Sequence, residues 1–207
     1  RLWGVPQSPE HHPEVDTGIH VMLVLDRAAQ LGAPLAVRFA CLGHDLGKGT
    51  TSADVLPRHI GHEERSARLL KGVCERLRVP VDCRELADVV AREHGNIHRS
   101  ETLGAAALVR LLERCDALRK PARFHEVLVA CECDARGRLG MGEIAYPQRD
   151  RLAQALVWAQ SVNTAGIAAQ AQADGLSGPK VGEQIHKARV AAVARGLGAA
   201  DPAPAGD

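Results

Sequence analysis

The stretch FACLGHDLGKG, residues 39–49, decides how this chain is interpreted. An apolar run typical of a buried helix leads directly into His44 and Asp45, and Gly47 then lets the chain leave the helix. Neighbouring residues on a helix project about 100° apart. An imidazole and a carboxylate are therefore presented side by side at one helix end. Such a pair is either a buried His–Asp hydrogen bond or a pair of metal ligands, and the surrounding sequence favours metal ligands.

Three further polar side chains lie on apolar helical stripes. His20, His94 and Asp134 each have aliphatic residues at i, i+3 or i+4 spacing, so we expect them to point inward. Burying a carboxylate alone is costly, so an inward Asp134 needs a cation beside it. Inward His and Asp side chains on different helices of one bundle predict a metal cage. Mixed imidazole and carboxylate ligands suit Mn, Fe, Co, Ni or Zn better than Mg.

Composition favours a helical domain with an aliphatic core. The chain has 207 residues, of which 45% are hydrophobic, enough for one core and an attached helical extension. Aromatic residues make up only 2%, which argues against readers of single-stranded nucleic acid that stack bases on aromatic faces. The net charge of +1 gives no overall basic field, although a local basic patch remains compatible with it.

Cysteine usage and the chain start bear on the cellular setting. The six cysteines form no CxxC pair, so we expect small buried hydrophobes in a reducing cytoplasm. No apolar run is long enough for a membrane span, and no signal peptide opens the chain. The sequence begins with Arg1 and reads like the interior of a longer protein. We therefore expect a domain excised from a larger cytoplasmic protein.

Helix starts, helix stops and loop composition divide the chain. Asp16 and Thr17 are predicted to cap the first helix, and prolines and glycines mark the later breaks. The predicted helices cover residues 17–31, 35–46, 62–78, 82–94, 104–118, 122–136, 148–172 and 180–196. We expect a functional domain over 1–146, a C-terminal helical extension packed on it over 147–197, and a disordered tail over 198–207.

These motifs resemble the HD superfamily, whose pattern is H…HD…D. His20, His44, Asp45 and Asp134 match it in order, RHIGHE (residues 58–63) resembles the family's GH element, and REH (residues 92–94) resembles its later histidine. The phrases LWGVPQSPEHHPEVDTGIH, CERLRVP and DARGR, at residues 2–20, 74–80 and 134–138, are similar to the C-terminal HD domains of bacterial multifunctional CCA-adding enzymes, which are tRNA nucleotidyltransferases. This resemblance extends to about residue 195.

The resemblance implies an all-α fold: an HD-domain helical bundle with a C-terminal helical extension. It implies metal-dependent phosphohydrolysis, namely 2′,3′-cyclic phosphodiesterase, 2′-nucleotidase and phosphatase action. The implied partners are a tRNA 3′ end or a nucleotide 2′,3′-cyclic phosphate, and a covalently linked nucleotidyltransferase domain in the full-length protein. The GS motif and paired aspartates of that domain are absent from this sequence, so CCA addition is not expected of this part. We expect no membrane association, and a homodimer is compatible with the resemblance.

Roles follow for individual residues. The predicted metal ligands are His20, His44, Asp45 and Asp134, holding a divalent metal for which Ni, Mn, Co or Fe is favoured and Mg is the alternative. The predicted catalytic residues are His44, Asp45, His94, His62 and Lys48. The predicted substrate-binding residues are Lys48, His62, His94, Arg136 and Arg138.

The mechanism expected of these residues is in-line hydrolysis. Asp45 would orient the attacking water, and His94 or His62 would donate a proton to the leaving oxygen. Alternatively, these two histidines would complete a second metal position or bind the substrate phosphate. Lys48 would steady the phosphate as a point charge. Five other histidines are expected to be surface or packing residues: His11, His12, His98, His125 and His186.

Two other interpretations remain open at this point. The chain could be a tRNA-binding or dimerisation module whose HD site is vestigial, although the intact ligand set argues against it. It could also act on another HD substrate, such as a deoxynucleoside triphosphate or guanosine tetraphosphate, although no extended basic triphosphate pocket is evident. Metal analysis and turnover of a 2′,3′-cyclic nucleotide discriminate between an enzyme and a binding module.

Overall fold

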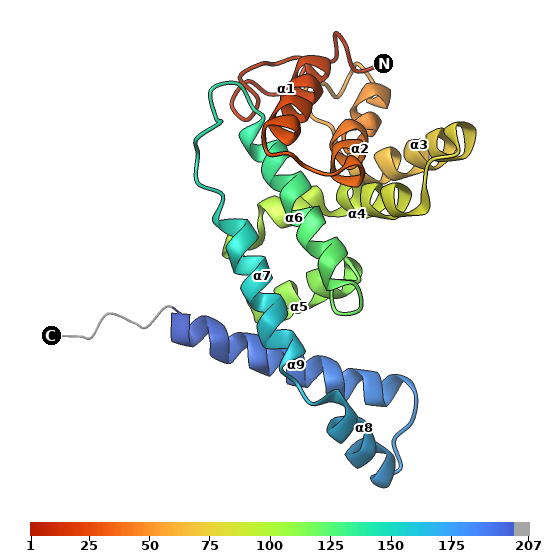
Figure 1. Ribbon diagram of the computed structural model, residues 1–207, viewed down its shortest axis with the longest axis vertical. Helices are drawn as coiled ribbons and strands as arrows, with labels where there is room; N and C mark the ends of the chain where they lie inside the picture. The colour runs from red at the N-terminus through yellow and green to blue at the C-terminus, as the bar shows by residue number, and fades with distance from the viewer. Residues whose placement is uncertain (201–207) are drawn as a thin grey trace, which may run out of the picture. The chain divides into compact units, whose positions relative to one another are not determined.

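The structure is a computed structural model that describes residues 1–200 and is built from helices (Figure 1). The α-helices are α1 (Thr17–Gln30), α2 (Leu35–Gly43), α3 (His62–Leu77), α4 (Val81–His98), α5 (Ala105–Arg114), α6 (Pro121–Arg136), α7 (Pro147–Gln160), α8 (Thr164–Ala173) and α9 (Pro179–Ala200), and two 3₁₀ helices are η1 (Leu46–Thr50) and η2 (Ser100–Thr102). Among these residues the only β pairing is an isolated bridge between Pro6 and Asp16. The predicted all-α class is confirmed.

The start of α1 and the end of α2 follow from local chemistry. The Asp16 carboxylate accepts a hydrogen bond from the Ile19 backbone N–H at 3.0 Å, which confirms the predicted cap. Helix α2 begins after Pro34 and ends at Gly43, earlier than expected. His44 is its C-cap, and Asp45 is the N-cap of η1. The His–Asp pair therefore forms the joint between two helices instead of lying within one.

Several predicted helix ranges were wrong. The helix expected over 104–118 is α5, which ends at Arg114. Helix α4 continues to His98 instead of ending at residue 94. The single helix expected over 148–172 is two helices, because Asn163 caps a new one by accepting from the Gly166 backbone N–H at 3.0 Å. Helix α9 extends to Ala200, so residues 198–200 of the expected tail are helical. The rest of that tail, residues 201–207, lies outside the described residues.

The chain divides into two compact units. The first contains Arg1–Arg99 and Ala122–Arg149, and the second contains Ser100–Pro121 and the chain from Asp150 onward. In the first unit α2 packs against α1 and α4, and α3 packs against α4 and η1. In the second unit α9 packs against α5 and α8. The predicted boundary after residue 146, between a functional domain and a C-terminal extension, stays a prediction.

The interior of the first unit is aliphatic, as the composition predicted. Val24, Val37, Leu86 and Leu128 are fully buried, and Phe124 is an aromatic exception. All six cysteines are buried thiols, which confirms their predicted packing role. No helix within residues 1–200 is long and apolar enough to cross a membrane.

Gly47 lets η1 approach α3 closely. A Cβ at Gly47 would lie 2.1 Å from the His62 carbonyl oxygen and 2.7 Å from the Ser66 backbone nitrogen. The Gly47 N–H donates to Ser66 Oγ at 2.8 Å. Because the atoms that a side chain would meet are backbone atoms, only glycine fits. This contact fixes the segment after His44 and Asp45 against the start of α3.

Two glycine-to-alanine substitutions should therefore have opposite effects. Gly47→Ala should lower the free energy of unfolding by about 1–3 kcal/mol, because the added methyl group overlaps backbone atoms. A Cβ at Gly72, which is exposed on α3, meets nothing within 4 Å. Gly72→Ala should raise the free energy of unfolding by about 0.5–1 kcal/mol. Urea unfolding followed by circular dichroism measures both, and equal stability of Gly47→Ala and wild type would contradict this packing.

Candidate metal centre

The four predicted metal ligands meet inside the first unit. His20 comes from α1, His44 and Asp45 come from the joint after α2, and Asp134 comes from α6, and all four are buried. His20 Nε2 lies 3.0 Å from Asp134 Oδ1, and His44 Nε2 lies 3.2 Å from Asp45 Oδ2. His44 Nε2 also lies 3.7 Å from Asp134 Oδ2. One ligand atom each from His20, His44 and Asp134 lie within 4.8 Å of one another, close enough to share a metal ion.

A second group of ligand atoms adjoins the first through Asp45. Its Oδ1 lies 3.3 Å from His62 Nε2 and 3.7 Å from His94 Nε2. The two histidine Nε2 atoms lie 3.2 Å apart. His62 starts α3 and His94 belongs to α4. Asp45 therefore presents one oxygen to His44 and the other to this second pair, so His62, His94 and Asp45 Oδ1 could hold a second cation.

Backbone carbonyls set the tautomers of three of these histidines. The Nδ1 atoms of His44, His62 and His94 each face a carbonyl oxygen three or four residues earlier. The accepting carbonyls are those of Cys41, His59 and Val90, at 2.8, 2.8 and 3.0 Å, respectively. A neutral imidazole that donates from Nδ1 keeps a lone pair on Nε2. All three Nε2 lone pairs are thus aimed at the carboxylates, as metal-binding histidines require.

The two groups together form one cluster, made of His20, His44, Asp45, His62, His94 and Asp134. Several of its buried polar atoms lack a hydrogen-bond partner. His44 Nε2 and Asp45 Oδ1 are buried and make no hydrogen bond to any described residue, and the close partner of Asp45 Oδ2 is the Lys48 ammonium at 2.7 Å. The facing Nε2 lone pairs of His62 and His94 would repel each other unless a proton or a cation lay between them. Leaving such groups unsatisfied costs about 1–3 kcal/mol each. A divalent cation would satisfy them together, so the residues fit a metal.

The electrostatics of the cluster also favour a cation. Burial disfavours the charged imidazole of His44, but Asp45 and Asp134 outweigh burial and raise its pKa to about 10. Burial raises the pKa of the Asp45 carboxyl, yet His44 and Lys48 hold it well below its ordinary value. Burial and the charge of His44 lower the pKa of His94 to about 3. The ionised carboxylates stabilise a positive charge at this place, and a proton and a metal ion compete for the imidazole nitrogens beside them.

The predicted substrate-side cations lie at different places. Lys48 is buried, with its Nζ 2.7 Å from Asp45 Oδ2 and donating to Gln7 Oε1 at 2.5 Å. Arg136 instead pairs with Glu132 at 2.7 Å and donates to the Gly142 carbonyl at 3.0 Å. It is thus engaged with its own helix and with the loop over residues 137–146. The charge of Arg138 is close enough to His12 to contribute to lowering the pKa of that histidine.

Two histidines expected at the surface or in packing contact the cluster instead. His98 Nε2 lies 2.7 Å from Asp134 Oδ2, and the His12 ring lies edge-on to His20 with centroids 4.6 Å apart. That expectation was wrong for both. His98 follows His94 by one helical turn, and this i+4 relation is visible only once α4 extends past His94. His12 lies in an irregular segment, where no periodicity indicates its direction.

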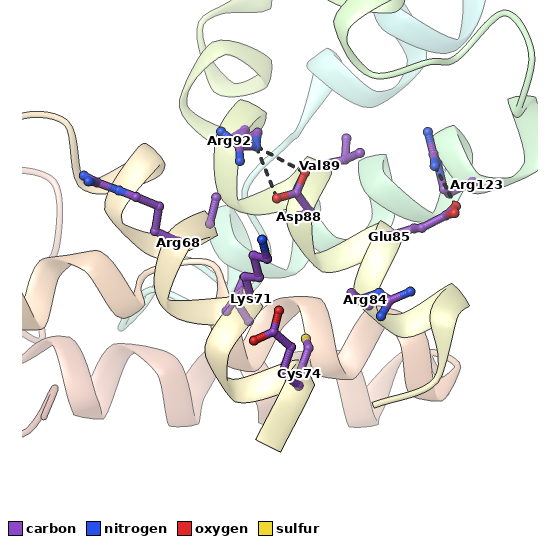
Figure 2. Close-up of a pocket in the computed structure, with 12 residues that line it drawn as sticks. Arg68, Lys71, Cys74, Arg84, Glu85, Asp88, Val89, Arg92 and Arg123 are labelled. Atoms are coloured by element: carbon purple, nitrogen blue, oxygen red, sulfur yellow. Dashed lines mark hydrogen bonds and ion pairs between the residues drawn. The ribbon is translucent and has the colours of Figure 1, made fainter. Parts of the chain in front are cut away.

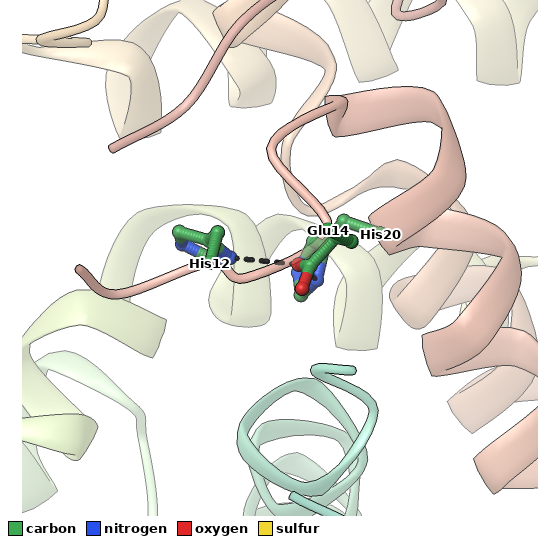
Figure 3. A group of neighbouring side chains, drawn as sticks. All are labelled: His12, Glu14 and His20. Carbon is green, nitrogen blue, oxygen red and sulfur yellow. Dashed lines mark hydrogen bonds and ion pairs between the residues drawn. The ribbon is translucent and has the colours of Figure 1, made fainter. Parts of the chain in front are cut away.

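Glu14 is a further residue that sequence reasoning missed. Figure 3 shows its carboxylate between His12 and His20, with Oε1 3.1 Å from His12 Nδ1 and 2.8 Å from His20 Nδ1. Its Oε2 accepts from the Leu139 backbone N–H at 3.1 Å. Burial raises the pKa of Glu14, but hydrogen bonds from His20 and from the backbone N–H groups of Glu14 and Leu139 lower it to about 2. A carboxylate at Nδ1 leaves His20 Nε2 facing Asp134.

A cavity of about 430 Å³ lies apart from this cluster, between α3 and α4 (Figure 2). Its floor is largely aliphatic, and its rim mixes cations with carboxylates. Arg92 pairs with Asp88 at 3.1 Å, and Arg123 pairs with Glu85 at 3.0 Å. None of the cluster's histidines or aspartates lines this cavity, so it is not the centre described above.

Comparisons with known proteins place the cluster within a matched family region. Residues 17–136 match the HD domain family. The chain is 76% identical over 205 residues to the Multifunctional CCA protein of Acidovorax sp. (strain JS42), 74% over 203 residues to that of Paracidovorax citrulli (strain AAC00-1), and 65% over 201 residues to that of Cupriavidus metallidurans. These alignments cover 99%, 98% and 97% of this chain but 48% of each relative. The chain thus spans about half the length of these curated relatives. No solved structure matched it.

Glu14 should affect metal binding without touching the metal. Glu14→Ala should weaken divalent-metal affinity by about 10–100-fold, because His20 loses the carboxylate that orients its ring. Competition with a chromogenic chelator measures this affinity. His125→Ala, at an exposed position on α6, is the matched control and should leave the affinity unchanged. Equal affinities for Glu14→Ala and wild type would exclude this role.

Proposed function

Because this chain belongs to the HD-domain family, we propose that it is a metal-dependent phosphohydrolase. Its metal ligands are His20, His44, Asp45 and Asp134. The observation that carries the proposal is the buried Asp45 carboxylate. Lys48 Nζ lies 2.7 Å from its Oδ2, whereas Oδ1 faces the Nε2 atoms of His62 and His94 and makes no hydrogen bond among residues 1–200. A site built only for stability would have satisfied or replaced such a group.

The proposed substrate is a nucleotide 2′,3′-cyclic phosphate or 2′-phosphate, with the tRNA 3′ end as its natural carrier. The support is the high identity to proteins named Multifunctional CCA protein. The proposed reactions are 2′,3′-cyclic phosphodiesterase, 2′-nucleotidase and phosphatase action. In the full-length protein a covalently linked nucleotidyltransferase domain would accompany this part, since the relatives are about twice as long as the matched region. A homodimer and a cytoplasmic location stay predictions.

The donor set favours Ni, Mn, Co or Fe, with Mg the less suitable choice, because it is rich in imidazole. His62 and His94, together with Asp45 Oδ1, would hold a second cation beside the first. A bound divalent cation would supply Lewis acidity, lowering the pKa of water and neutralising charge on phosphoryl oxygens.

The chain's own residues would orient and neutralise the reacting groups. Lys48 Nζ lies 2.7 Å from Asp45 Oδ2, where it would hold the carboxylate in place and add a positive charge near a bound phosphate. The lowered pKa of His94 keeps its imidazole neutral near physiological pH, which favours a ligand role over proton donation. In the alternative to a second cation, the partly exposed His62 would donate a proton to the leaving oxygen. Arg138 is the proposed contact for a substrate phosphate, with Arg136 holding the adjacent loop.

Ligand substitutions test the proposed reaction. His44→Gln and Asp45→Asn should each lower turnover of 2′,3′-cyclic AMP by about 10³-fold or more, because several kcal/mol of transition-state stabilisation depend on the metal. Helicity by circular dichroism should change little, and His125→Gln should behave as wild type. Turnover that survives in either ligand variant would refute the site.

Metal removal tests the same proposal independently. Dialysis against a chelator should abolish turnover, and adding back Ni²⁺, Mn²⁺, Co²⁺ or Mg²⁺ one at a time should restore it with different efficiencies. Full activity after complete chelation, verified by elemental analysis, would show that the reaction needs no metal. Inactivity with every cation, together with retained tRNA binding, would favour the binding-module alternative.

A further inference from the structure

Two side chains outside the recognised motifs, His98 and Tyr146, support Asp134: His98 contacts it directly, and Tyr146 contacts His98. His98 Nε2 lies 2.7 Å from Asp134 Oδ2, and His98 Nδ1 lies 2.8 Å from the Tyr146 hydroxyl. The His98 and Tyr146 rings meet edge-on, with centroids 5.8 Å apart. His98 ends α4, and Tyr146 is the last residue before α7. A continuous chain of contacts thus runs from Tyr146 through His98 to a predicted metal ligand.

A neutral His98 that carries its proton on Nε2 satisfies every contact in this chain. Asp134 must be ionised in order to bind a metal ion. An ionised carboxylate only accepts hydrogen bonds, so His98 must donate to it from Nε2. In a neutral imidazole Nδ1 is then the acceptor, and the Tyr146 hydroxyl donates to it.

This tautomer is opposite to that of the predicted ligands. His44, His62 and His94 donate from Nδ1 and keep Nε2 free, whereas His98 carries its proton on Nε2. Its lone pair faces Tyr146 and not the centre of the cluster. His98 is therefore suited to orienting a ligand and unsuited to being one.

The two oxygens of Asp134 are fixed from opposite sides. His20 Nε2 contacts Oδ1 at 3.0 Å, and His98 contacts Oδ2 at 2.7 Å. The backbone of His98 is itself anchored, because Gln148 Nε2 donates to its carbonyl at 3.1 Å. The segment that carries Tyr146 and Gln148 thus contacts the end of α4 through two hydrogen bonds, one to the His98 side chain and one to its carbonyl. These contacts set the plane of the Asp134 carboxylate before any metal binds.

We propose that His98 and Tyr146 are positioning residues that preset Asp134 for metal binding, an inference that rests on the proposed metal centre. The loop over residues 137–146 then has a role at both of its ends. Near its start the Leu139 N–H holds Glu14, which orients His20, and at its end Tyr146 holds His98. One loop thereby supports two metal ligands from different helices without providing a ligand itself.

The test measures metal affinity by chelator competition, which does not depend on activity. His98→Ala should weaken affinity by about 10–100-fold, and Tyr146→Phe, which removes only a hydroxyl group, should weaken it less. His98→Gln should recover most of the affinity, because its amide N–H can still donate to Asp134. His186→Ala is the matched control, since it removes a histidine–carboxylate contact of 2.9 Å with Glu113 in the second unit. It should leave the affinity unchanged.

The visible spectrum of the Co²⁺-loaded protein adds a readout that general stability does not move. We expect His98→Ala and Tyr146→Phe to shift the Co²⁺ bands, and the His186→Ala bands to match wild type. Unchanged affinity and an unchanged spectrum in both His98→Ala and Tyr146→Phe would overturn the proposal. So would a His98→Gln variant that loses metal as completely as His44→Gln, because His98 would then be a ligand. If His98→Ala does not fold, Tyr146→Phe decides. A wild-type chain that binds no divalent cation would instead overturn the proposed function.

Discussion

The buried carboxylate of Asp45 is the constraint on which the arrangement of the first unit depends. Its two oxygens face two sets of imidazoles, and Lys48 approaches from a third side. A carboxylate in such a position is costly unless cations or donors surround it. The end of α2, the tight turn at Gly47 and the start of α3 bring those groups to it. The local chain path around the joint thus follows the needs of one ionised side chain.

The inner and outer parts of the cluster are controlled by different kinds of structure. Helical carbonyls, three or four residues earlier, fix the tautomers of His44, His62 and His94. The orientation of His20 and Asp134 depends instead on Glu14 and His98, which are held by irregular segments and helix ends. Helices therefore supply the ligands, and loops adjust two of them. Such outer contacts are known to tune metal affinity strongly.

The sequence indicated which ligand side chains point inward, but it did not indicate the residues that orient two of them. The reason is physical. His20, His44, Asp45 and Asp134 lie on or next to helices, where apolar spacing indicates direction. Glu14, His12 and Tyr146 lie in segments without periodicity, so nothing in their spacing indicates where they point. His98 was missed because α4 was expected to end at His94. The break between α7 and α8 was missed because its signal is a single asparagine cap.

X-ray absorption spectroscopy of the metal-loaded chain tests the central claim most directly, because it reports the ligands of the ion itself. The account predicts a mixed shell of oxygen and nitrogen, with the outer-shell scattering of imidazole from at least two histidines. It also predicts that this imidazole scattering decreases in His44→Gln. A shell made of oxygen alone, or imidazole scattering unchanged in that variant, would contradict a metal centre at His20, His44, Asp45 and Asp134.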